Sequence, residues 1–79
     1  MNPTPLLDRL RAKRTLPPAD ERRKIREAAG ASLRDVAAEI GTSATSVIRW
    51  ERGASPGRHT AAYARLLSDL QQLAGGAAP

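Results

Sequence analysis

The residues with recognisable chemistry are arginines and small polar side chains in the stretch 32–58. Because successive side chains of a helix are about 100° apart, a helix over 43–52 places four side chains on the side away from Val47 and Trp50. They are Thr45, Ile48, Arg49 and Arg52. This side carries two guanidinium groups, a hydroxyl and an apolar tip but no acid. It is therefore better suited to the major groove of DNA than to a protein core.

Within this stretch we assign base reading and phosphate binding to different residues. Arg49 is the candidate for a paired hydrogen bond to O6 and N7 of guanine, and the apolar Ile48 suits a thymine methyl. The candidates for base contacts are Ala44, Thr45, Ile48 and Arg49. Phosphate contacts set position without reading sequence. The candidates for them are Arg34, Ser43, Ser46, Arg52 and Arg58.

Two short helices joined by a tight turn are predicted to position these side chains. Ser32 is placed to cap the first helix, and Asp35, three residues later, completes a capping box. Gly41 can adopt a positive φ and so ends that helix. Ser43 is placed to cap the second helix, whose opposite side is apolar. Trp50 belongs to that side, so we expect its ring in the core.

A distinctive arrangement of residue types runs through this stretch: small residues at the helix crossing, a glycine turn, and a charged end around one tryptophan. The residues are Ala29-Gly30-Ala31-Ser32, Val36-Ala37, Ile40-Gly41, Ser43, Val47 and Arg49-Trp50-Glu51-Arg52-Gly53. They resemble the helix-turn-helix of the phage repressor and Cro family (XRE-like). The resemblance implies that Arg26 pairs with Glu51. The usual glutamine after the cap is Leu33 here, and leucine cannot bond to a phosphate.

The resemblance also implies a fold and a function. We expect an all-α bundle of about five helices, with the helix-turn-helix formed by the third and fourth. The function implied is sequence-specific binding of double-stranded DNA by a small transcriptional regulator. Two alternatives stay open, since fold alone does not fix function. One is a protein-interaction module, such as an antitoxin or adaptor; the other is an architectural or recombination-directionality factor on DNA.

Turn formers and periodicity divide the remaining chain. Residues 1–17 form a basic amphipathic segment, which could pack on the domain, dimerise or grip DNA. Residues 18–74 form the helix-turn-helix domain, with the motif itself at 32–53, and 75–79 are a disordered tail.

Two helices flank the motif within the domain. The first begins near Pro18 or Ala19 and ends at Ala29, with Ile25, Ala28 and Ala29 buried. Its cations Arg22, Arg23 and Lys24 are assigned to a solvated face. The second begins near Thr60 and ends at Ala74 before two glycines. Its buried stripe is predicted to be Tyr63, Leu66, Leu67, Leu70 and Leu73.

Composition favours a nucleic-acid partner and gives no sign of other chemistry. The net charge is +5 and the isoelectric point about 11.1, a balance that favours polyanions. There is no cysteine, and the single histidine, His59, has no ligand-forming neighbours. We therefore expect no enzyme activity, metal, cofactor or small-molecule ligand.

No apolar run approaches the roughly 20 residues that span a membrane. We expect a cytoplasmic, nucleoid-associated homodimer bound to two-fold DNA.

Overall fold

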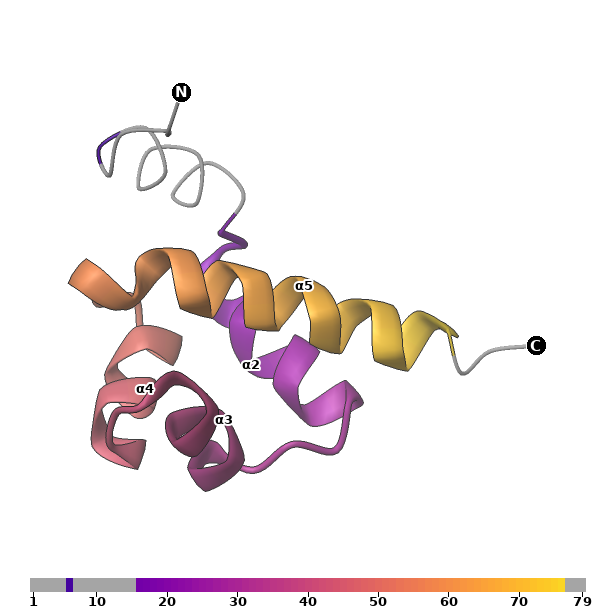
Figure 1. The fold of residues 1–79 in the computed structure, drawn as a ribbon. Helices are drawn as coiled ribbons and strands as arrows, with labels where there is room; N and C mark the ends of the chain where they lie inside the picture. The colour runs from indigo at the N-terminus through magenta and orange to yellow at the C-terminus, as the bar shows by residue number, and fades with distance from the viewer. Residues whose placement is uncertain (1–5, 7–15, 77–79) are drawn as a thin grey trace.

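The computed structural model describes Leu6 and residues 16–76, and the regular secondary structure of these residues is entirely helical (Figure 1). The elements are α2 (Ala19–Ala28), α3 (Leu33–Ile40), α4 (Ala44–Glu51), a 3₁₀ turn η1 (Gly57–His59) and α5 (Thr60–Gly76). The all-α prediction is confirmed. Of the five expected helices, the one in the N-terminal segment lies outside the described residues, as does the end of the tail.

Local hydrogen bonds define the ends of α3. The Ser32 Oγ accepts from the Asp35 N–H at 3.0 Å, and the Asp35 Oδ2 accepts from the Ser32 N–H at 2.8 Å. The backbone hydrogen bond, followed by that with the hydroxyl of Ser32, lowers the pKa of Asp35. Gly41 ends α3 with φ +88°, a conformation that suits glycine. The capping box and the glycine turn predicted from the sequence are both confirmed.

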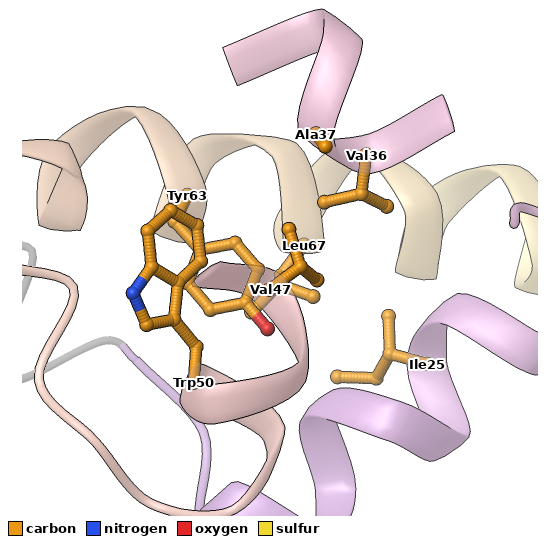
Figure 2. Close-up of a cluster of buried hydrophobic side chains, with 7 residues drawn as sticks. All are labelled: Ile25, Val36, Ala37, Val47, Trp50, Tyr63 and Leu67. Carbon is orange, nitrogen blue, oxygen red and sulfur yellow. The ribbon is translucent and has the colours of Figure 1, made fainter. Parts of the chain in front are cut away.

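The core lies where α5 crosses α2, α3 and α4 (Figures 1 and 2). Figure 2 shows its seven buried side chains. They are Ile25, Val36, Ala37, Val47, Trp50, Tyr63 and Leu67. Ala37 is the small residue that lets α3 approach its neighbours closely, and Trp50 is only 4% exposed. The prediction that the tryptophan belongs to the core is confirmed.

Three predictions about the flanking helices are wrong in detail. α5 continues through Gly75 to Gly76, because a glycine in the last turn of a helix costs only about 1 kcal/mol relative to alanine. Ala28 is exposed, because only the Ile25 side of α2 faces the core. Leu73 is 64% exposed, because the C-terminal part of α5 extends past the other helices (Figure 1). No helix of the described residues is both long and apolar enough to cross a membrane.

Tyr63 brings a polar group into this core. Its side chain is 1% exposed and its ring centroid lies 4.8 Å from that of Trp50. The hydroxyl has no hydrogen-bond partner among the described residues. Burial, with a smaller contribution from the charge of Glu51, raises the pKa of Tyr63 to about 12. Folding therefore favours the neutral phenol.

The raised pKa of Tyr63 predicts how stability changes in alkali. The pKa of Tyr63 in the folded protein lies above the usual value of 10. The contribution of the neutral phenol to the free energy of unfolding is therefore complete below pH 10 and is lost as the pH rises toward 12. Tyr63→Phe should remove this part of the alkaline loss. At pH 7 the substitution should cost less than about 1 kcal/mol, because the hydroxyl makes no hydrogen bond within the protein. Urea unfolding of both proteins from pH 8 to 12 measures the effect; parallel curves would contradict it.

Candidate nucleic-acid interface

The helix α4 presents two different faces. Val47 and Trp50 on its inner face are 0% and 4% exposed. On the outer face Thr45, Arg49 and Arg52 are exposed, with Arg52 directly after the last residue of the helix. Ile48, expected to be exposed, is half-buried. The rotation of α4 thus leaves a hydroxyl and two guanidinium groups on a surface that the core does not use.

The N-terminal end of α4 joins this surface. Ser43 caps the helix, its Oγ accepting from the Ser46 N–H at 3.2 Å. The two serine hydroxyls are 3.1 Å apart, so Ser43 is held in place by its neighbour. Ala44 and Ser46 are half-buried, and Ser43 is exposed. Backbone N–H groups at a helix N-terminus and hydroxyls beside them are suitable donors to a phosphate.

The arginines of the surface differ from the cations of α2 in their partners. On α2, Arg23 pairs with Glu27 at 3.3 Å and Lys24 with Glu21 at 3.6 Å. Five other arginines are exposed and, among the described residues, have no carboxylate within 4.0 Å. They are Arg34, Arg49, Arg52, Arg58 and Arg65. The first four belong to the set predicted to contact DNA, and their guanidinium groups are available to an external anion, whereas Arg65 lies on α5.

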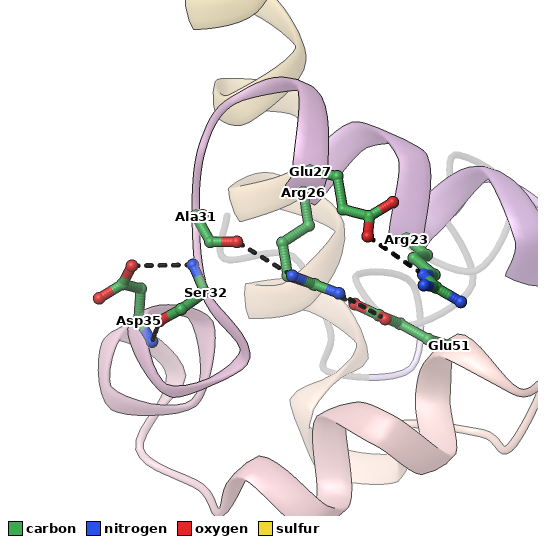
Figure 3. Close-up of polar contacts among 7 residues, drawn as sticks. All are labelled: Arg23, Arg26, Glu27, Ala31, Ser32, Asp35 and Glu51. Atoms are coloured by element: carbon green, nitrogen blue, oxygen red, sulfur yellow. Dashed lines mark hydrogen bonds and ion pairs between the residues drawn. The ribbon is translucent and has the colours of Figure 1, made fainter.

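A buried ion pair holds α4 to α2 (Figure 3). Arg26 Nε lies 2.6 Å from Glu51 Oε2, and Arg26 Nη2 donates to Glu51 Oε1 at 3.1 Å. The Arg26 Nη1 donates to the Ala31 carbonyl at 3.0 Å, just before α3. The two charged side chains are 11% and 8% exposed. The hydrogen bond with Glu51 raises the pKa of Arg26. One guanidinium group thus joins α2, the start of α3 and the end of α4.

A second arginine of α2 also contacts α4, and the sequence prediction for it was wrong. Arg22 was assigned to a solvated face, but its Nη1 donates to the Trp50 carbonyl at 2.9 Å. Its Nε donates to the Pro17 carbonyl at 2.8 Å. Arg22 lies three residues before Ile25 and four before Arg26, so all three share one side of α2. That shared side was the signal that could have identified Arg22.

Two further residues near the surface serve packing. Leu33, at the position where the resembled family has glutamine, is half-buried against the core. The half-buried imidazole of His59 lies 5.7 Å from the Trp50 ring. No group of three or more His, Cys, Asp or Glu side chains that could hold a metal ion occurs in the described part of the chain.

Comparison with known proteins identifies the family. A sequence model described as helix-turn-helix matches residues 23–62, just over half of the chain. The chain belongs to this family, of the Cro and phage-repressor type, and is a DNA-binding protein of the transcription-regulator class. Curated proteins and solved structures gave no match.

The contacts of Arg22 predict that this residue contributes more to the free energy of unfolding than its neighbour Arg23. Arg22→Met should lower the free energy of unfolding by about 1.5–3 kcal/mol, because two carbonyls lose a charged donor. Arg23→Met is the matched control. It removes an exposed pair on the same helix and should change stability by less than about 0.5 kcal/mol. Urea unfolding at pH 7 measures both; equal losses would contradict the role of Arg22.

The pair of Arg26 and Glu51 predicts strong coupling. Because both side chains are largely buried, removing either partner alone should cost about 3 kcal/mol. A double-mutant cycle with Arg26→Met and Glu51→Gln should give a coupling energy of about 1–3 kcal/mol in stability, and coupling in DNA affinity as well. Thermal unfolding and DNA titration supply the two readouts. Additive effects in both would mean that the pair does not position α4.

Proposed function

We propose that this chain is a small regulator of the repressor type, which binds specific double-stranded DNA with α4 in the major groove. The observation that carries the proposal is the outer surface of α4 and its surroundings. It holds four exposed arginines without a carboxylate partner among the described residues, and a helix held in one orientation by Arg26 and Glu51. Such a surface matches a polyanion with readable base edges.

In this proposal base reading and positioning belong to different side chains. Arg49 donates to guanine O6 and N7, and Thr45, Ala44 and Ile48 contact base edges or a thymine methyl. Phosphate contacts come from several elements and fix the register. They are Arg34 on α3, Ser43 and Ser46 at the start of α4, Arg52 after it, and Arg58 in η1.

The proposal includes a dimer on two-fold DNA. One module of this size buries roughly 600–1,000 Å² of protein surface on DNA, and two copies double the contacts. A protein-interaction module is the competing function. The exposed arginines of α4 favour DNA over it, because the core of a protein interface is depleted of charge.

The experiment that tests the proposal is selection of bound duplexes from random DNA. A two-fold motif is the expected result, with an affinity that falls on a log–log salt plot with a slope of about −4 to −5, since about five phosphates are neutralised. Binding without an enriched motif would favour an architectural factor on DNA. No binding, or an affinity indifferent to salt, would favour the interaction module.

The division of roles predicts that substitutions of Arg49 and Arg52 have different effects on DNA affinity and on sequence selection. Arg49→Ala should weaken the selected site by roughly 1–3 kcal/mol and relax selection at one base pair. Arg52→Ala is the matched control. It should weaken all duplexes alike and make the salt slope shallower by about one unit. Titrations of selected and scrambled duplexes at several salt concentrations separate the two. If Arg49→Ala weakens both duplexes equally, the base-reading assignment is wrong.

A further inference from the structure

An apolar groove of about 190 Å³ lies between α3 and α5, on elements that the proposed function uses little. Its lining is Ala31, Asp35, Val36, Glu39, Leu66 and Leu70. Leu73 follows Leu70 by three residues, so it extends the same side of α5. The large apolar side chains that stand exposed among the described residues are Leu73, at 64%, and Leu6, at 59%. Leu73 lies one helical turn beyond the groove residue Leu70, and Leu6 belongs to the N-terminal segment.

The charges around the groove narrow the choice of what fills it. Both charged residues of its lining, Asp35 and Glu39, are acids. The Asp35 carboxylate accepts the Ser32 N–H, whereas the exposed Glu39 has no ion-pair partner among the described residues. The surface therefore combines apolar side chains with a negative rim. It fits a segment that carries leucines on one side and positive charge beside them.

The sequence of this chain contains such a segment at 6–14. Leucines at positions 6, 7 and 10 share one side of a helical pattern, and four cations accompany a single acid, Asp8. The cations are Arg9, Arg11, Lys13 and Arg14. We propose that the groove between α3 and α5 receives residues 6–14 of a second copy, so that two chains exchange these segments. This contact would form the dimer that the proposed function includes, and in that respect it rests on that function.

The position of the linker favours a second copy over the same chain. Arg22 fixes the Pro17 carbonyl beside the end of α4. From there α2, ten residues or about 15 Å long, runs to the end where the groove begins at Ala31. Two residues separate Arg14 from Pro17, so this linker spans at most about 11 Å, which is less than the length of α2. The basic end of the same chain's segment therefore stops short of the groove, whereas that of a second copy carries no such restraint.

Sedimentation equilibrium of the full chain tests the proposal. The wild type should form a reversible dimer, and Glu39→Lys should raise the dimer dissociation constant about tenfold, because it places like charges together. Leu73→Gln should act in the same direction through lost apolar burial. Glu27→Lys is the matched control. It makes the same charge change at an exposed site of α2 outside the groove and should leave the dimer unchanged. Circular dichroism checks that each variant is folded.

A charge swap identifies the occupant. Arg11→Glu with Arg14→Glu should weaken the dimer, and adding Glu39→Lys to that chain should restore it at least in part. A chain that is monomeric at all concentrations, a dimer indifferent to Glu39→Lys, or no restoration in the combined variant would overturn the proposal. DNA selection is scored separately. Selection of a motif by a chain that fails these tests rejects the groove contact alone, and a dimer that passes them without selecting DNA rejects the proposed function.

Discussion

The ion pair between Arg26 and Glu51 is the interaction on which the arrangement of the helices depends. Glu51 shares the inner side of α4 with Val47 and Trp50, where an unpaired carboxylate would cost several kcal/mol. Arg26 satisfies both carboxylate oxygens and, with its remaining nitrogen, the carbonyl before α3. Rotating α4 about its axis breaks these bonds together. The orientation of its outer face is therefore fixed before any DNA is present, which avoids the cost of ordering it on binding.

The arginines and the lysine of the described residues fall into three groups according to their partners. Arg22 and Arg26, on the inner side of α2, bind groups of α4. Arg23 and Lys24, on its outer side, form exposed pairs along the helix worth a few tenths of a kcal/mol. The arginines proposed to contact DNA and Arg65 on α5 have no carboxylate within 4.0 Å among the described residues. Whether a carboxylate lies beside each arginine is therefore more informative about DNA binding than the net charge of +5.

The sequence was sufficient to predict the structure where that structure depends on residues close together in the chain. Ser32, Asp35 and Gly41 determine the ends of α3 through contacts within a few positions, so caps and turn could be predicted. The partner of Arg22 could not, because a backbone carbonyl 28 residues away has no signature in the sequence. Nor could the exposure of Leu73, which depends on how far other helices extend. The resemblance indicated the partner of Arg26, whereas the base-reading roles on α4 stay predictions.

Helix length explains why the chain has two separate surfaces. At about 1.5 Å per residue, the 17 residues of α5 extend about twice as far as the eight of α3 or α4. α5 must therefore overhang its neighbours, and its leucine stripe continues past the residues that can cover it. The exposed Leu73 is the consequence. The overhang lies on α5 and the groove lies between α3 and α5, whereas Arg49, which is proposed to read bases, lies on α4. A partner in the groove leaves the outer face of α4 open, so in the proposed dimer association and DNA binding do not compete.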